Sequence, residues 1–198
     1  KEPLETFYSN TVGTLNILES LRQVKKRCHA VIVTSDKSYK NLEIDRGYRE
    51  NDLLGGEDPY SGSKGAAELI INSYYKSILI NNRNLSISVS RAGNVIGGGD
   101  WSEDRIVPDC IKSWSKNRIV KIRNPNSTRP WQHVLEVVRG YLQSAIIVKF
   151  NKKLNGEVFN FGPNNSQNKS VVQLVREIKK YWSQVDWQIV KAKVDKKE

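Results

Sequence analysis

Residues 59–67 read Pro-Tyr-Ser-Gly-Ser-Lys-Gly-Ala-Ala and open a long helical pattern in which Tyr60 stands four residues before Lys64. Four residues span just over one helical turn, so both side chains leave the same face of the helix. An ammonium group held beside a phenol lowers the pKa of that phenol, because it stabilises the phenolate. Such a phenol can remove a hydroxyl proton near neutral pH, as alcohol oxidation requires. The same spacing also occurs on ordinary exposed helix faces, so the other segments must decide between these readings.

Two predicted strands flank this helix, and each leads into residues suited to ligand binding. Residues 30–34 form a β-branched apolar run, typical of a strand covered on both faces, and are followed by Ser35, Asp36 and Lys37. Residues 85–90 alternate between apolar and polar and lead into Arg-Ala-Gly-Asn-Val-Ile-Gly-Gly-Gly-Asp-Trp at 91–101. Ligands of open α/β sheets bind at the carboxyl ends of strands, which favours a site here. For residues 35–37, a plain polar loop is an equally good reading.

Composition limits the classes of protein that fit. Of the 198 residues, 38% are hydrophobic and 27% charged, which is ordinary for a globular chain. No apolar run reaches membrane-spanning length, and the start lacks a signal-peptide pattern, so we expect a cytoplasmic protein. The two cysteines, Cys28 and Cys110, match no zinc or redox spacing, and there are only two histidines, so we expect no metal site.

The chain is basic, with 32 lysines and arginines against 21 acidic residues and a net charge of +11. The basic residues are dispersed along the sequence instead of being concentrated on one element with interleaved aromatics, which disfavours nucleic-acid binding. Solvated surface charge, together with a site for a phosphorylated ligand, explains the balance better.

The remaining segments alternate between helical and strand patterns. We expect helices over about 6–27, 105–115, 134–150 and 170–181, strands over 119–122, 157–163 and 187–190, and a long loop over 39–58. The fold class predicted is therefore α/β: the later half of a doubly wound parallel sheet followed by a smaller α/β unit. Ser170 is expected to cap the helix that it precedes.

Four blocks occur in one order: Thr34-Ser35-Asp36-Lys37 after a strand, Tyr60-x-x-x-Lys64 on a helix, residues 91–101 after the next strand, and Arg-Pro-Trp-Gln-His-Val at 129–134. In this combination the chain resembles the extended short-chain dehydrogenase/reductase family, and within it the nucleotide-sugar 4,6-dehydratases, especially the branch that acts on CDP-glucose. The resemblance runs from Asn10 to about Trp187.

The resemblance implies a partial Rossmann-like fold with an interleaved substrate-binding domain. Residues 1–99 would form the later half of the NAD-binding domain, and 100–198 mainly the nucleotide-sugar domain, with 157–163 returning to the sheet. It also implies a homodimer, formed through a four-helix contact of the helices that contain Asn10 and Tyr60. The expected pathway makes deoxysugars for surface polysaccharide such as lipopolysaccharide O-antigen.

The resemblance assigns a catalytic role to five residues. Tyr60 would take the proton of the hydroxyl on sugar carbon 4, while Lys64 lowers the pKa of Tyr60 and binds the nicotinamide ribose. Ser35 would donate to the same hydroxyl, and Asp36 would be the acid for the hydroxyl leaving carbon 6. Lys37 stands where many sugar-nucleotide dehydratases carry the glutamate that removes the carbon 5 proton. A lysine must lose its own proton to act in this way.

Further positions are candidates for ligand contacts. The cofactor-binding set is Thr34, Tyr60, Lys64 and Asn94, and the substrate-binding set is Asn94, Arg105, Arg123 and Arg129. A guanidinium can bind two diphosphate oxygens at once, although each arginine can equally be structural. A lone histidine such as His133 is more often packed than catalytic, and Trp101 and Trp131 either stack on the base or pack.

One family feature is missing from this sequence, which contains no Gly-x-x-Gly-x-x-Gly motif for the pyrophosphate of NAD. We therefore expect the middle and later part of a longer enzyme, with weak NAD binding on its own. One alternative is a sugar-nucleotide 4-epimerase or reductase, which shares Tyr60 and Lys64 but needs no acid and base for water loss. A second is a non-catalytic fragment or a basic interaction protein.

Overall fold

The computed structural model describes residues 2–164, 168–182 and 185–190. The chain packs into two compact units, the first made of Lys1–Gly93 with Leu135–Gly162 and the second of Asn94–Val134 with Pro163–Glu198. The chain thus leaves the first unit after the second of the two predicted strands and later returns to it. The ligand-binding roles expected for 1–99 and 100–198 stay predictions, because packing alone defines these units.

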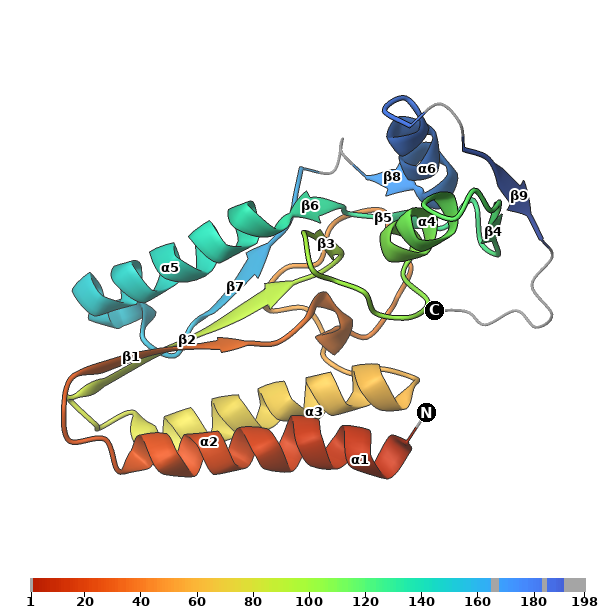
Figure 1. Ribbon diagram of the computed structural model, residues 1–198. Coiled ribbons are helices and arrows are strands. Elements are labelled where there is room, and N and C mark those ends of the chain that lie inside the picture. Colours follow the sequence, from red (N-terminus) through yellow and green to blue (C-terminus); the bar gives the residue numbers. More distant parts are fainter. Residues whose placement is uncertain (1, 165–167, 183–184, 191–198) are drawn as a thin grey trace. The chain divides into compact units, whose positions relative to one another are not determined.

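The first unit is built on a three-stranded parallel sheet (Figure 1). Its order is β1 (Cys28–Val33), β2 (Leu85–Ala92) and β7 (Val158–Phe161), so that β2 is the central strand. All three strands run in the same direction, and their carboxyl ends lie at one edge of the sheet. The segments that follow β1 and β2 are therefore brought to that edge.

Helices cover both faces of this sheet, with α2 and α3 on one face and α5 on the other (Figure 1). The helical segments of the unit are α1 (Pro3–Phe7), η1 (Tyr8–Val12), α2 (Gly13–Arg22), η2 (Asp36–Ser38), α3 (Pro59–Tyr74), η3 (Tyr75–Leu79), α5 (Val134–Phe150) and η4 (Lys152–Leu154). A parallel sheet with helices on both faces confirms the fold class predicted from the sequence.

The alternating sequence of β2 gives the central strand two different faces. Leu85, Ile87 and Val89 are buried in a hydrophobic core with side chains of α2 and α3. The serines between them point to the opposite face, where the Ser88 hydroxyl lies 3.2 Å from the Ser144 hydroxyl of α5. The small side chains on this face allow α5 to pack closely against the sheet.

The second unit has its own hydrophobic core, which includes Cys110, Trp114, Val120, Ile122 and Val175. Its elements are α4 (Ile106–Trp114), α6 (Val171–Lys179), the parallel pairs β3 (Val95–Ile96) with β6 (Gln132–His133) and β4 (Val120–Ile122) with β9 (Trp187–Ile189), and the antiparallel pair β5 (Thr128–Arg129) with β8 (Lys169–Ser170). Ser170 caps α6 as predicted, in a capping box with Gln173.

Across the described ranges 2–164, 168–182 and 185–190, no helix combines the length and the apolar character needed to cross a membrane.

Candidate active site

The segment after β1 turns at once into a short 3-10 helix, η2 (Asp36–Ser38), which fixes the predicted catalytic side chains. The Ser35 hydroxyl accepts from the Lys37 backbone N–H at 3.2 Å and donates to Asp36 Oδ1 at 3.0 Å. The Ser38 hydroxyl, fully buried, donates to the Ser35 carbonyl at 2.7 Å. Ser35 is itself only 7% exposed, so the segment is held rigidly at the carboxyl end of the sheet.

Asp36 packs directly against the backbone at the end of β2. A Cβ atom added to Gly93 would lie 1.9 Å from Asp36 Oδ2 and 2.1 Å from its Cγ. No side chain fits at this position while Asp36 keeps its place. The glycine of the Arg-Ala-Gly-Asn block therefore makes room for the carboxylate that follows the neighbouring strand.

The helix that carries Tyr60 and Lys64 begins at a well-formed cap. Asp58 Oδ1 accepts from the backbone N–H groups of Tyr60 and Ser61, at 2.9 and 3.1 Å, and Pro59 occupies the first helical position. Partial burial raises the pKa of Asp58, but the hydrogen bonds from Ser61 and Tyr60 and the charge of Lys37 outweigh this effect and hold the pKa below its ordinary value of 3.8. A Cβ atom added to Gly65 of α3 would lie 3.3 Å from the Ser38 carbonyl oxygen, so η2 packs against the first turns of α3.

Tyr60 and Lys64 lie on one face of α3, as the spacing predicts. The Lys64 ammonium nitrogen is 5.8 Å from the centroid of the Tyr60 ring. Burial lowers the pKa of Lys64, because it penalises the charged form. Tyr60 remains 46% exposed, so its ring is accessible to a ligand.

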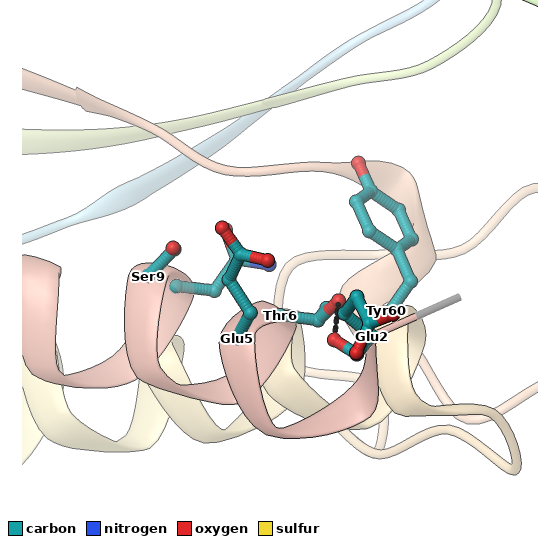
Figure 2. Close-up of a pocket in the computed structure, with 6 residues that line it drawn as sticks. Glu2, Glu5, Thr6, Ser9 and Tyr60 are labelled. Atoms are coloured by element: carbon teal, nitrogen blue, oxygen red, sulfur yellow. Dashed lines mark hydrogen bonds between the residues drawn. The ribbon is translucent and has the colours of Figure 1, made fainter.

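Figure 2 shows a depression beside Tyr60 that sequence reasoning missed. α1, η1 and α2 follow one another without a break and form the N-terminal helical run. The depression is lined by Tyr60 of α3 and by residues at the start of this run, namely Glu2, Glu5, Thr6, Ser9 and Asn10. Asn10 donates from Nδ2 to the Ser63 hydroxyl at 2.9 Å and thus braces α3. Residues 6–10 carry no sequence motif. Their position beside Tyr60 follows from the packing of the N-terminal helix against α3, which the sequence does not show.

A buried ion pair, also missed, connects α3, β2 and the end of β1. Arg91 donates from Nε and Nη2 to the two carboxylate oxygens of Glu68, at 2.7 and 2.9 Å, and each residue is 3% exposed. Thr34 donates its hydroxyl hydrogen to Glu68 Oε1. If Thr34 contacts a cofactor as predicted, its hydroxyl can therefore serve only as an acceptor.

The substrate-binding candidates Asn94, Arg105, Arg123 and Arg129 all lie in the second unit. Arg123 Nη2 donates to Asp104 Oδ1 at 2.6 Å, and Arg105 Nε lies 4.0 Å from Asp100 Oδ2.

Asn94 and the two tryptophans that were considered from the sequence, Trp101 and Trp131, differ in their surroundings. The Asn94 backbone is left-handed, with φ at 51°. The Trp131 indole donates to the Lys169 carbonyl at 3.2 Å, which favours a packing role, whereas Trp101 is 56% exposed.

The structure thus brings together five predicted catalytic residues in the first unit: Ser35, Asp36, Lys37, Tyr60 and Lys64. The four predicted substrate contacts belong to the second unit. Within the described residues, no three side chains among His, Cys, Asp and Glu are grouped closely enough to hold a metal ion.

Comparisons with known proteins identify the family of the chain. The family model of GDP-mannose 4,6 dehydratase matches residues 1–197. The CDP-glucose 4,6-dehydratase of Salmonella typhimurium is 43% identical over 186 residues, covering 92% of this chain and 52% of that protein. The dTDP-D-glucose 4,6-dehydratase of Dictyostelium discoideum is 27% identical over 173 residues, covering 82% of this chain and 37% of that protein. The chain thus spans about half or less of the length of these relatives.

Solved structures share the fold. The dTDP-glucose 4,6-dehydratase of Bacillus anthracis, in complex with NAD, superposes with a TM-score of 0.71 at 24% identity, over 94% of this chain and 57% of that one. The UDP-N-acetylglucosamine 4-epimerase of Methanobrevibacter ruminantium gives a TM-score of 0.79 at 17% identity, over 97% of this chain and 59% of that one. Taken with the residues above, these matches show that the chain belongs to the GDP-mannose 4,6 dehydratase family.

Proposed function

We propose that the protein containing this chain is an NAD-dependent hydro-lyase that converts CDP-glucose to CDP-4-keto-6-deoxyglucose and water. The observation that carries the proposal is the pairing of two groups within one unit: the Ser35–Lys37 segment after β1, and Tyr60 with Lys64 on α3. An oxidation base and an acid/base pair are both needed to remove water from a sugar. The identity to the Salmonella enzyme supports CDP as the nucleotide.

The side chains fit the nicotinamide end of NAD. Lys64 is half-buried beside the Tyr60 ring, so its ammonium group can bind a ribose hydroxyl next to the phenol. The left-handed turn at Asn94 follows Gly93, where the chain passes close to Asp36. When bound there, NAD would supply the hydride chemistry of the reaction, as the acceptor of a hydride from sugar carbon 4 and the donor of a hydride to carbon 6.

The proton transfers are assigned to this chain's own residues. Tyr60 takes the proton of the carbon 4 hydroxyl. The Ser35 hydroxyl turns from Asp36 Oδ1 and donates its hydrogen bond to the oxygen that becomes a ketone. The ketone acidifies the hydrogen on carbon 5, which Lys37 removes. Asp36 protonates the carbon 6 hydroxyl, which leaves as water. A proton returned to carbon 5 completes the product.

Arg105, Arg123 and Arg129 are proposed to bind the diphosphate. The Arg123–Asp104 and Arg105–Asp100 pairs have mostly exposed side chains, and such pairs are weak in water. A diphosphate offers more negative charge and a bidentate geometry, so it can replace the carboxylates.

The same proposal includes a homodimer formed through the N-terminal helical run and α3. Both elements expose large apolar side chains, among them Tyr8, Ile17 and Leu69, which are 64%, 57% and 59% exposed. Light scattering coupled to size-exclusion chromatography measures the mass, and a monomer at micromolar concentration contradicts this part.

Mass spectrometry of a sugar nucleotide incubated with NAD and the longest polypeptide that the gene encodes tests the reaction. CDP-, dTDP- and GDP-hexoses are run in parallel. We expect loss of one water from CDP-glucose alone. Loss from another nucleotide overturns the choice of CDP but keeps the reaction. Unchanged masses from a protein that binds NAD indicate the epimerase or reductase instead.

A further inference from the structure

The Arg91 guanidinium, buried at the carboxyl end of the central strand, connects three segments that sequence motifs do not relate. Its Nε and Nη2 groups bind the Glu68 carboxylate of α3. Its Nη1 group donates to the Tyr39 hydroxyl at 2.6 Å and to the Glu50 carbonyl at 3.1 Å. Nε and Nη2 of the guanidinium therefore bind α3, whereas Nη1 binds Tyr39 and the long loop 40–58 that follows it.

The loop is held at the same place by further contacts. The Tyr39 hydroxyl donates to Asn160 Oδ1 of β7 at 2.7 Å, and the Arg91 guanidinium lies 4.6 Å from the centroid of the Tyr39 ring. Asn160 also donates from Nδ2 to the Tyr48 carbonyl at 2.9 Å and from its backbone N–H to Glu50 Oε1 at 2.8 Å. Buried polar networks of this kind fix one conformation only when each group has its partners.

The Glu68 carboxylate carries the connection to the predicted catalytic residues. Glu68 lies two turns beyond Tyr60 and one beyond Lys64, on the same side of α3. The carboxylate also accepts from the hydroxyl of Thr34, which directly precedes Ser35 in the chain. The Glu68 carboxylate thus links α3, which carries Tyr60, to the segment that carries Ser35, and it fixes the distance between them.

We propose that Thr34, Glu68 and Arg91 are positioning residues: they hold Ser35–Lys37 in register with Tyr60 and Lys64 and fix loop 40–58 at the carboxyl end of β2 and β7. The inference deepens the proposed function and rests on it for its kinetic readout. A mispositioned Ser35 weakens the stabilisation of developing charge more than it weakens ground-state binding. Loss of the Thr34 hydroxyl therefore lowers kcat much more than it changes KM.

The first test compares Thr34→Val with Thr34→Ser in the longest polypeptide that the gene encodes. Valine has the shape of threonine without the hydroxyl, and serine restores the hydroxyl without the methyl group. We expect kcat of the serine variant to exceed that of the valine variant by on the order of tenfold, with KM values and NAD dissociation constants within about twofold. Equal kcat values overturn the inference. A weakened NAD affinity of the valine variant with equal kcat also overturns it, since it indicates the cofactor contact predicted from the sequence.

The second test is independent of the reaction. Amide hydrogen exchange, read by mass spectrometry on proteolytic peptides, compares the same polypeptide with its Thr34→Val and Arg91→Lys variants. We expect Thr34→Val to accelerate exchange in residues 35–38, and Arg91→Lys, which keeps the charge but loses the fork, to accelerate it in 40–58 as well, by roughly tenfold. Unchanged exchange in both segments overturns the inference even if the sugar is dehydrated. If no nucleotide sugar reacts but exchange rises as described, the proposed function fails and the positioning role stands.

Discussion

At the scale of single residues, the most constrained contact of the candidate site lies between Gly93 and Asp36. Replacement by alanine places a methyl carbon where the Asp36 carboxyl group now lies, so that the carboxyl group must move. We expect Gly93→Ala to lower the free energy of unfolding by about 1–3 kcal/mol and to lower the dehydration rate more than tenfold. Urea unfolding and initial rates measure the two effects.

Gly13→Ala serves as the matched control. No atom lies within 4 Å of the Cβ that it would add, leaving aside the helix's own backbone, and the residue is helical. The free energy of unfolding of this variant is expected to rise by up to about 1 kcal/mol, because alanine favours the helical conformation more than glycine does. Equal stabilities of the two variants would show that Asp36 is easily displaced.

Lys37 gives a second residue-scale prediction, because a lysine base and a glutamate base lose their protons in different pH ranges. Unperturbed carboxylates lose theirs near pH 4 and ammonium groups above about pH 10. If Lys37 is the carbon 5 base, Lys37→Glu moves the ascending part of the rate-versus-pH profile toward acid. Initial rates between about pH 5 and pH 10 measure this shift. Superimposable ascending parts for parent and variant exclude Lys37 as the base.

At the scale of elements, the Asp58 cap fixes where α3, the helix that carries Tyr60 and Lys64, begins. Asp58→Ala removes the acceptor of two backbone hydrogen bonds and is expected to lower the free energy of unfolding by about 1 kcal/mol at pH 7, measured by urea unfolding.

The charge of this cap is tested by Asp58→Asn, which keeps an acceptor but not the charge. Since the pKa of Asp58 lies below 3.8, its charge stabilises the fold above that pH, and the contribution is lost as pH falls through the folded-state pKa. The free energy of unfolding of the parent should therefore exceed that of the asparagine variant at pH 7 and equal it at strongly acidic pH. A difference in stability that stays constant over this pH range contradicts this account.

Elements with strong local patterns were predictable from the sequence. The alternation of 85–90, the apolar run at 30–34 and the helix after Pro59 all occur in the structure at nearly the expected places. The Thr34–Glu68–Arg91 network was not predicted, because hydrogen bonds between distant segments leave no local period. One signal was available: Arg91 continues the buried positions 85, 87 and 89 of β2, and a buried cation requires a carboxylate partner.

The division between two units could not be read from sequence for a related reason. The sequence pattern of the helix at 134–150 suits a place in either unit. The packing of Gly140 against the Phe161 ring and the Ser88–Ser144 contact show that it covers the sheet of the first. Two of the three arginines that were predicted to bind phosphate, Arg105 and Arg123, lie beside Asp100 and Asp104, carboxylates that the sequence reading did not pair with them.

At the scale of the whole molecule, the two hydrophobic cores share no residue, and all five tryptophans belong to the second unit. Tryptophan fluorescence therefore reports on the second unit, while far-ultraviolet circular dichroism reports on both.

These two probes can test whether the units unfold separately. Ile87→Ala removes a buried side chain from the first core and Ile122→Ala removes one from the second, each lowering the free energy of unfolding by about 2–5 kcal/mol. We expect Ile87→Ala to shift the dichroism midpoint in urea more than the fluorescence midpoint, and Ile122→Ala to shift the fluorescence midpoint clearly. Identical shifts by both probes for both variants would mean that the units unfold as one.

The parallel pairing of β2 with β7 also has a consequence for synthesis on the ribosome. β2 ends at Ala92, but its second neighbour begins only at Val158, after the first segment of the other unit and the helix α5. The nascent polypeptide must therefore carry one unpaired edge of its central strand while residues 93–157 emerge. Unpaired strand edges of this kind associate readily with other chains, and late long-range pairing is slow. A chaperone that shields β2 during this interval would increase the yield of folded protein, and release of the chain before Phe161 would leave a product prone to aggregation.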